Sequence, residues 1–387
     1  MPEAVPKPLR IALFTGNYNY IKDGVALTLN RLVAYLEKNN IPVLIFAPTA
    51  KAPAFQSVGE VVSVPSMAIP FRPEYRIALG LPKAARVRLK EFNPTLFHIA
   101  VPDILGYQAL KQAEAWSLPV VATFHTRYDT YLKFYGFGFL EKYAVSYFRK
   151  FYARCKMIYP PSQSMADALR ADGIAENLEV FGRGVESELF TPTRRSLEWR
   201  RKYEISDEDI VVCFVSRLVK EKNTDLMARC FKRLRESGVK FRPLIVGLGP
   251  EEKNLRVAIP DAVFAGFLQG EALAVAYASS DIFFFPSESE TFGNVTLEAM
   301  ACGLPAIVAD ATGSRSLVED GKSGFVQNTR DEIGFDRALL RLIEDAKLRK
   351  SMGTAARKRA LTFNWDVILA KLVASFRVIS DQYSSTQ

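Results

Sequence analysis

Histidine and cysteine are both scarce in this sequence. Its 387 residues include two histidines, His98 and His125, and four cysteines, none of which forms a C-x-x-C pair. We therefore expect neither a zinc site nor a disulfide framework, and two histidines leave little room for a histidine-rich metal centre. Any catalysis must depend on carboxylates, arginine, lysine, backbone amides and one imidazole at most.

Long apolar runs are also missing. No run approaches the roughly 18 residues of a membrane-spanning helix, and the opening MPEAVPKPLRIALF lacks the apolar stretch and cleavage site of a signal peptide. The composition, with 49% hydrophobic and 24% charged residues, is that of an ordinary globular protein. We therefore expect a cytoplasmic protein, soluble or peripheral to a membrane, of two domains or one large domain.

Positive charge is concentrated in the first half of the chain. Residues 1–187 hold 22 Lys and Arg against 15 Asp and Glu, whereas residues 188–387 hold 29 against 27. The first half therefore carries +7 of the net charge of +9. This imbalance favours an anionic surface or ligand as the partner of the first half.

Short apolar runs alternate with amphipathic stretches along the whole chain, which predicts parallel, doubly wound α/β sheets. In the first half the expected strands lie at 10–14, 42–48 and 118–124, and the expected helices at 26–39, 75–91 and 104–116. The alternation restarts at 210–218, so two similar Rossmann-like domains are expected, facing each other across a cleft at the carboxyl ends of their strands. The expected segments are an acceptor-side domain at 1–185, a nucleotide-sugar-binding domain at 186–362, and a helix at 363–387 that packs back on the first domain.

Two glutamates mark the segment PSESETFGNVTLEAMACGLPAIV at 286–308. Glu290 and Glu298 are separated by seven residues, and a helix is expected to begin between them. Its first amides, near Gly293, would then be free to bind an anion or an oxygen-rich ligand. Alternatively, the two acids merely cap and solubilise the helix.

In this setting the segment resembles the C-terminal motif of the retaining family-four glycosyltransferases, which have the GT-B fold. SRLVKEKN (216–223) resembles the family's basic stretch that holds the donor diphosphate, KDGVALTLNRL (22–32) its glycine loop, and FHTRYDTYLKFYG (124–136) matches the position of its histidine. The resemblance covers nearly the whole chain in the right order. Details such as GRGVESELFTPTRR resemble the branch that contains GDP-mannose-dependent α-mannosyltransferases and sulfoquinovosyl or glycosyl diacylglycerol synthases.

The resemblance implies roles for individual residues. Arg217 and Lys222 match the pair that neutralises the departing nucleoside diphosphate without a metal; the alternative is a solvated basic loop. Glu290 matches the acid that contacts the donor sugar, and Glu298 the acid that binds the ribose. His125 matches the histidine that contacts the donor sugar, although a lone histidine is commonly structural.

Three glycines and an aromatic residue complete the expected donor site. The amides of Phe292 and Gly293 would lie beside the donor sugar. Gly24 matches a glycine that lets the first helix approach the diphosphate closely, although family members usually carry two adjacent glycines and this chain has Asp23 first. Gly247 is expected to line the cleft near the nucleotide.

Other candidate groups are expected to lie outside the site. His98 falls inside a strand-like run and is expected in the core or the cleft wall. Asp207 and Asp209 form a D-x-D pattern that metal-dependent sugar transferases use, but it precedes a strand and so faces away from the cleft. We therefore expect a surface turn there, no metal, and no cofactor beyond the nucleotide sugar.

Residues 127–156 combine 11 aromatic residues with seven Lys and Arg and two acids. One interpretation is a partly buried helix with a solvated basic face, and another is a nucleic-acid surface, for which no recognised module is present. We favour a third, in which the segment lies on an anionic membrane with its aromatic side chains among the headgroups. Its membrane-facing cations would be Lys142, Arg149, Lys150 and Arg154, beside Tyr143, Tyr147, Phe148, Phe151 and Tyr152.

The sequence therefore predicts a metal-independent, retaining hexosyltransferase. Its donor would be a UDP- or GDP-linked hexose or hexuronic acid, and its acceptor a lipid such as diacylglycerol at the inner face of the cell membrane. Two alternatives remain: an enzyme with a soluble or polysaccharide acceptor, and a sugar-nucleotide binding protein without activity. The base, the sugar, the acceptor and the oligomeric state are not given by the sequence, and no nucleic-acid partner is expected.

Overall fold

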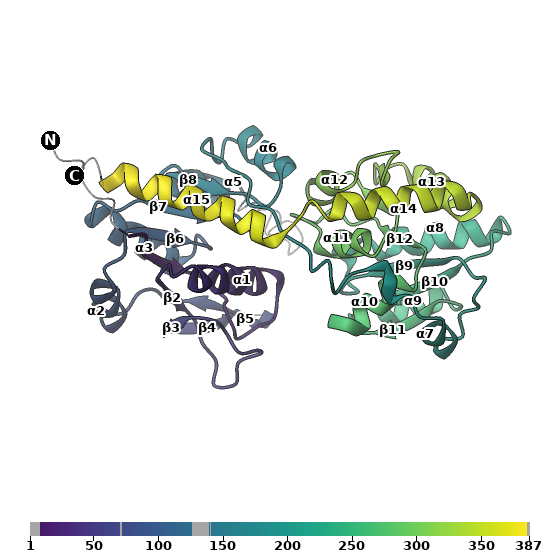
Figure 1. Cartoon of the computed structure of the whole chain (residues 1–387), viewed down its shortest axis with the longest axis horizontal. Helices are drawn as coiled ribbons and strands as arrows, with labels where there is room; N and C mark the ends of the chain where they lie inside the picture. Colours follow the sequence, from purple (N-terminus) through teal and green to yellow (C-terminus); the bar gives the residue numbers. More distant parts are fainter. Residues whose placement is uncertain (1–7, 70–71, 126–138, 140, 385–387) are drawn as a thin grey trace. The chain divides into compact units, whose positions relative to one another are not determined.

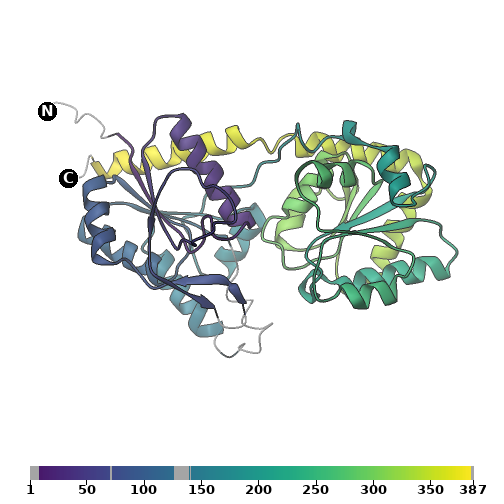
Figure 2. The ribbon, with the colours of Figure 1, turned by 90° about the horizontal axis from the view of Figure 1, so that it is seen from below.

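A computed structural model describes residues 8–69, 72–125, 139 and 141–384 (Figure 1). The chain divides into two compact units. The first combines Met1–Gly182 with Asp366–Gln387, and the second is the continuous segment Arg183–Trp365. Each unit contains a six-stranded parallel sheet with helices on both of its faces (Figure 2). The expected α/β class with two doubly wound sheets is therefore confirmed.

The sheet of the first unit has the strand order β3-β2-β1-β6-β7-β8. Its strands are β1 (Ile11–Phe14), β2 (Val43–Ala47), β3 (Glu60–Ser63), β6 (Leu96–Ile99), β7 (Val120–Thr123) and β8 (Met157–Tyr159). Its helices are α1 (Gly24–Lys38), α2 (Lys83–Phe92), α3 (Ile104–Ala115), α5 (Glu141–Tyr152) and α6 (Gln163–Ala171). The central strands are buried along their whole length, as expected where helices cover both faces.

The helix expected at 75–91 is partly wrong. Its first residues belong to an antiparallel hairpin, formed by β4 (Ser66–Ile69) and β5 (Arg72–Ala78). The helix α2 begins only at Lys83, with Pro82 at its N-cap. Proline has no amide hydrogen and cannot lie inside a helix without breaking a hydrogen bond, so Pro82 separates the two elements.

The last helix, α15 (Trp365–Ser384), packs on the first unit. The ring of Phe376 is fully buried and lies edge-on to His98, with 5.4 Å between ring centroids, and to Tyr159, at 5.5 Å. Beside it, the hydroxyl groups of Ser375 and Tyr159 are 2.7 Å apart. Helix α15 therefore supplies part of the core of the first unit, although it follows the second unit in the sequence.

The sheet of the second unit has the strand order β11-β10-β9-β12-β13-β14. Its strands are β9 (Val211–Val215), β10 (Arg242–Val246), β11 (Val263–Gly266), β12 (Ile282–Phe285), β13 (Ala306–Ala309) and β14 (Gly324–Gln327). Its α-helices are α7 (Leu197–Lys202), α8 (Thr224–Glu236), α9 (Glu252–Ala258), α10 (Gly270–Ala278), α11 (Asn294–Ala301), α12 (Thr312–Leu317), α13 (Glu332–Glu344) and α14 (Ala346–Ala360). Short 3-10 turns are η2 (Pro192–Arg194) and η3 (Lys220–Lys222).

Both sheets contain a point at which the direction of winding reverses. In the second unit β9 and β12 are neighbours, but the chain leaves β9 towards β10 and leaves β12 towards β13, on the opposite side. The loops that follow two such strands diverge and leave room for a ligand between them. The corresponding point in the first unit lies between β1 and β6.

Candidate functional site

The loops after β9 and β12 carry the basic and acidic residues singled out in the sequence. Lys222 ends the turn η3, and its ammonium group forms an ion pair with the carboxylate of Glu290. The same ammonium lies 3.1 Å from the hydroxyl of Ser289. Both charged side chains are largely buried, with 12% and 18% of their surfaces exposed. The structure therefore brings two sequence-predicted residues together at the winding reversal of the second unit.

Two further residues hold these loops against each other. Asn223 adopts a left-handed conformation with φ of 54°, which ends η3, and its side-chain amide donates to the carbonyl of Pro286 over 2.9 Å. The hydroxyl of Ser289 donates to the carbonyl of Glu221 over 3.1 Å. Sequence reasoning missed both residues.

Arg217 differs from Lys222 in its exposure. Its side chain is 53% exposed, and its nearest carboxylate is that of Glu221, at 4.0 Å. An exposed pair at this distance is weak. The guanidinium is therefore available to an anionic ligand at the mouth of the site.

The amino end of α11 is open. Its N-cap is Gly293, which has a φ of +99°, and the first turn has neither a capping side chain nor an acidic residue. The buried hydroxyls of Thr296 and Ser314 would lie 3.5 and 3.6 Å from a Cβ placed on Gly293, and neither has a hydrogen-bond partner in the part of the chain that the structure describes. Free amides at a positive helix end favour a negatively charged or oxygen-rich ligand.

The backbone beside Glu290 is fixed by the start of α12. The amide of Gly313 donates to the carbonyl of Glu290 over 2.9 Å. A Cβ on Gly313 would lie 2.6 Å from the amide nitrogen of Phe292, so a larger residue would force the two segments apart. The side chain of Phe292 is buried and meets Phe363 edge-on. Phe292 thus anchors the loop through its ring.

Glu298 lies in the middle of α11 and receives a hydrogen bond from a buried tyrosine. The phenol of Tyr277, on α10, donates to its carboxylate over 3.4 Å. Burial, followed by the charge of Glu298, raises the pKa of Tyr277 well above its usual value. The phenol therefore remains a donor throughout the working pH range. The sequence gives no sign of this partner, because Tyr277 stands in an ordinary apolar helix.

Gly247 is required by the backbone itself. It has a φ of +132°, and a Cβ there would lie 1.8 Å from the carbonyl oxygen of Ser216. A Cβ on Gly249 would lie 2.2 Å from the carbonyl oxygen of Leu218. These glycines therefore let the loop after β10 pack directly against the loop after β9.

In the first unit, the amino end of α1 is already occupied by a carboxylate. Asp23 is the N-cap, and its side chain accepts from the amide of Ala26 over 2.8 Å and from the side chain of Asn17 over 2.6 Å. Gly24 is the first residue of the helix. The position that the family pattern gives to glycine therefore holds a negative charge beside the helix end.

Asp103 lies at the same winding reversal, after β6. It caps α3 by accepting from the amide of Gly106 over 2.8 Å. Burial raises its pKa from 3.8 to about 6, against the opposing effect of backbone amides, of which that of Gly106 is the strongest. A Cβ on Gly16 would lie 3.3 Å from its carboxylate, so the loops after β1 and β6 approach closely here.

The two histidines occupy different positions. His125 is 6% exposed and is the second residue after β7, while the segment after it, 126–138, lies outside the described residues. His98 is fully buried within β6, and its Nε2 lies 3.1 Å from the hydroxyl of Thr123. Burial lowers the pKa of His98 to about 3, so it stays neutral. His98 is thus a core residue, one of the two places expected for it.

Helix α5 is only partly an exposed basic and aromatic surface. The aromatic side chains of Phe148, Phe151 and Tyr152 are buried in the core of the first unit, so the expectation that they insert among lipid headgroups is wrong. The reason is that the aromatic residues form one broad side of this amphipathic helix, and the part of that side formed by Phe148, Phe151 and Tyr152 packs into the core.

The four basic residues expected to face a membrane fall into two groups. Arg149 donates to the carbonyls of Gly173 and Asp172, at 2.7 and 3.1 Å, and Arg154 forms a two-pronged ion pair with Glu114. Lys142 and Lys150 are exposed and have no hydrogen bond or ion pair within the described ranges.

The acidic pair Asp207 and Asp209 lies before β9, at the amino edge of its sheet. Asp207 pairs with Arg201 at 2.5 Å, and Asp209 accepts from the amide of Ser206 at 2.8 Å. Among the residues whose structure is described, no group of three or more His, Cys, Asp or Glu side chains is arranged to hold a metal ion. In the same part of the chain, no helix combines the length and the apolar character needed to cross a membrane.

Two family profiles match the two halves of the chain. The profile for group 1 glycosyl transferases matches residues 196–359, and the profile for glycosyltransferase family 4 matches residues 22–189. The first covers the open end of α11 and the Lys222–Glu290 pair. The second begins just before the capped end of α1.

Curated relatives match over most of the chain. A sulfoquinovosyl transferase of Arabidopsis thaliana is 31% identical over 395 residues, covering 99% of this chain and 75% of that protein. A GDP-mannose-dependent alpha-mannosyltransferase of Mycolicibacterium smegmatis is 32% identical and covers 96% and 98% of the two chains. An alpha-monoglucosyldiacylglycerol synthase of Streptococcus pneumoniae is 27% identical, and the match covers 82% of this chain and 74% of that protein.

Among solved structures, a sucrose-phosphate synthase of Thermosynechococcus elongatus has a TM-score of 0.77 at 17% identity, covering 96% of this chain and 99% of that one. With the paired sheets described above, this likeness defines the GT-B fold of two Rossmann-like domains. The chain belongs to the glycosyltransferases of group 1 and family 4.

Proposed function

We propose that the chain transfers a hexose or hexuronic acid from a UDP- or GDP-linked donor, with retention at the anomeric carbon and without a metal. The observation that carries this proposal is the buried pairing of Lys222 with Glu290, beside the open end of α11. Without a ligand, each of these charged groups has the other as its partner. A donor would present its diphosphate to Lys222 and Arg217, and its sugar hydroxyls to Glu290.

The chemistry follows from this arrangement of charge. The bond between the anomeric carbon and the diphosphate oxygen breaks, and negative charge grows on the leaving diphosphate. Lys222, Arg217 and the amides at the start of α11 stabilise that charge. The acceptor oxygen attacks from the same face, and its proton passes to an oxygen of the leaving phosphate. Glu298, held by Tyr277, binds the ribose.

The donor site is tested by a screen of UDP- and GDP-sugars for hydrolysis and transfer, followed by substitution of one lysine. Lys222→Ala should lower kcat/KM by about 10²–10³, comparable to removing one charge-stabilising donor. Lys220→Ala is the matched control, because Lys220 is exposed in the same turn. Activity should also survive excess EDTA. Loss of activity in EDTA with recovery on adding Mn²⁺, or equal effects of the two lysine variants, would contradict the proposal.

The acceptor in this proposal is a lipid hydroxyl, presented at an anionic membrane surface by helix α5. Phe139, which precedes the helix, is 71% exposed. On α5, Tyr143 is 75% exposed and shares one face of the helix with the exposed Lys150. On the same face, the phenol of Tyr147 donates to the carbonyl of Pro102, in the loop after β6. The exposed surface therefore adjoins the winding reversal of the first unit, where a ligand of that unit would bind. The relative named as a monoglucosyldiacylglycerol synthase is consistent with such an acceptor.

Vesicle binding tests the membrane surface. The full chain should bind phosphatidylglycerol vesicles at low salt and lose most of that binding at physiological salt, because the attraction is screened. Lys142→Glu with Lys150→Glu should abolish vesicle binding and transfer to lipid while leaving donor hydrolysis in solution unchanged. Arg149 is left intact, since it holds the end of α6.

The matched control makes the same charge change on another helix of the first unit. Lys83 and Lys90 are exposed on α2, and Lys83→Glu with Lys90→Glu should leave vesicle binding within about twofold of the original. If both double variants lose binding equally, the effect is one of net charge. If neither loses binding, α5 is an ordinary helix surface and a soluble acceptor is favoured.

A further inference from the structure

A cavity of about 380 Å³ lies at the edge of the second sheet opposite the Lys222–Glu290 pair. Its lining includes Asp281, which immediately precedes β12, and Pro305, which immediately precedes β13. These are the amino ends of the strands, whereas the donor loops follow their carboxyl ends. The cavity is therefore separate from the site proposed for the nucleotide sugar, and its volume falls within the range of small-molecule sites.

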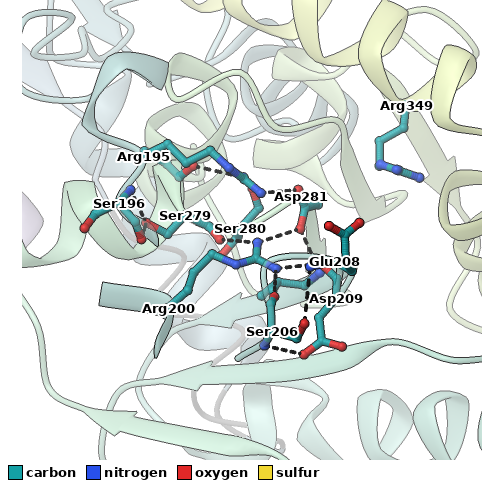
Figure 3. Close-up of polar contacts among 12 residues, drawn as sticks. Arg195, Ser196, Arg200, Ser206, Glu208, Asp209, Ser279, Ser280, Asp281 and Arg349 are labelled. Atoms are coloured by element: carbon teal, nitrogen blue, oxygen red, sulfur yellow. Dashed lines mark hydrogen bonds and ion pairs between the residues drawn. The ribbon is translucent and has the colours of Figure 1, made fainter. Parts of the chain in front are cut away.

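The carboxylate in the cavity wall is already neutralised (Figure 3). Asp281 pairs with Arg195 at 3.1 Å and with the fully buried Arg200 at 3.3 Å, and it also accepts from the amide of Val211 at 2.9 Å. Arg200 also donates to the carbonyls of Ser206, Asp209 and Ser279. Asp281 therefore leaves no uncompensated negative charge facing the cavity.

The remaining charged groups of the lining are positive and have unused hydrogen-bond donors. Arg349, on α14, uses its Nη1 to bind the carbonyls of Leu342 and Ile343, and its Nε and Nη2 have no hydrogen bond within the described residues. Lys350 is exposed and has no partner there either. The lining also includes the apolar residues Leu304 and Pro305.

We propose that this cavity binds a small phosphorylated molecule, either a phosphate monoester or inorganic phosphate. Arg349 would offer its two unused donors to the phosphate oxygens, and Lys350 would add a point charge at the opening. Leu304 and Pro305 would lie against the organic part of an ester. Glu208, which Figure 3 shows on the loop before β9, does not belong to the lining.

The proposal is tested by equilibrium dialysis of the full chain with radiolabelled inorganic phosphate and, separately, with glycerol 3-phosphate. Saturating UDP and GDP are present in both arms, so that the donor site is occupied and a failure of the proposed enzymatic function does not affect the result. Lys350→Glu should weaken binding at least tenfold, because it replaces one charge-assisted contact with a repulsion. Lys350→Ala should weaken it by a smaller factor.

The control is Lys347→Glu, which makes the same change on α14 at an exposed residue outside the cavity lining. It should leave binding within about twofold of the original. Binding of either probe that depends on Lys350 but not on Lys347 supports the site, and the arm that binds identifies the ligand as an ester or the free anion. Failure of both probes to bind, or equal binding to all variants, overturns it.

Discussion

At the scale of single residues, the buried phenol of Tyr277 gives the sharpest test of how Glu298 is held. Tyr277→Phe keeps the ring that packs against Phe283 and Phe190 and removes only the hydrogen bond to the carboxylate. We expect KM for the donor to rise about three- to tenfold while kcat is little changed, because the ribose contact is made equally in the bound donor and the transition state. Steady-state kinetics decide this. A fall in kcat at constant KM would place Glu298 in the chemical step instead.

Asp103 gives a prediction about pH. Its pKa is about 6 in the folded protein and 3.8 in a model peptide, so the folded state binds the proton more tightly. The stability of the first unit should therefore fall as pH rises from about 4 to about 7. Asp103→Asn keeps an oxygen for the amide of Gly106 and removes the charge. Across this window the free energy of unfolding of the variant should rise relative to that of the original chain by roughly 1–2 kcal/mol.

Hydrogen exchange of the amides of β1 and β6, corrected for intrinsic rates and measured at pH 4.5 and 7.5, provides the comparison. At pH 4.5 the amides of the original chain and of the Asp103→Asn variant should be similarly protected from exchange. At pH 7.5 they should be more strongly protected in the variant. An equal difference at both pH values would show that the substitution acts through the helix cap rather than through the charge.

At the scale of secondary-structure elements, the amino end of α1 differs from the family pattern in a testable way. Asp23→Asn retains the cap on Ala26, because asparagine is also a favoured N-cap residue. It removes a negative charge from the helix end that the family pattern assigns to the diphosphate. We expect KM for the donor to fall about two- to fivefold with little change in melting temperature. An unchanged KM at unchanged stability would mean that α1 does not approach the diphosphate in this chain.

The elements themselves could be predicted from the sequence where apolar periodicity was unambiguous. The run at 10–14 is a strand buried on both faces, as its continuous apolar character indicates, and the pattern at 26–39 is a helix, because its apolar residues recur on one face. Helix α5 could not be divided in advance into core and surface. Its aromatic residues form one broad side of the helix, and which of them pack inward is decided by the sheet beneath that side.

The candidate site was predictable in its charged residues and not in its supporting contacts. Lys222 and Glu290 were found because they match a motif. The hydrogen bonds of Asn223 to Pro286 and of Ser289 to Glu221 join residues 63 and 68 positions apart, so no local pattern reveals them. The cap formed by Asp23 involves only residues that are close in sequence. The structure was needed to show that its carboxylate lies at the helix end to which the family pattern assigns the diphosphate.

At the scale of the whole molecule, the two units differ in how the chain builds them. The second is one continuous segment that contains all six strands of its sheet. Residues 183–365 expressed alone should therefore fold and unfold cooperatively, with dispersed amide resonances. Residues 1–182 expressed alone lack Phe376 and should be compact but poorly ordered, because His98 and Tyr159 lose part of their packing.

A third version of the chain provides the control for the truncated first unit. Gly184 packs on Trp365, with a Cβ there only 2.7 Å from the backbone nitrogen of Trp365, so a few glycines can join residue 182 to residue 366. Joined in this way, 1–182 and 366–387 should recover dispersed resonances. Good dispersion from 1–182 without α15 would show that this helix is dispensable for the first unit.

The position of α15 also sets an order of events during synthesis. A ribosome that makes this chain from its amino end completes the second unit while the first still lacks its last helix. The unit that starts first is therefore finished last, after the final twenty or so residues have left the exit tunnel. A nascent chain, or one that loses its tail to a protease, would keep an intact second unit while His98 and Tyr159 in the first unit remain uncovered.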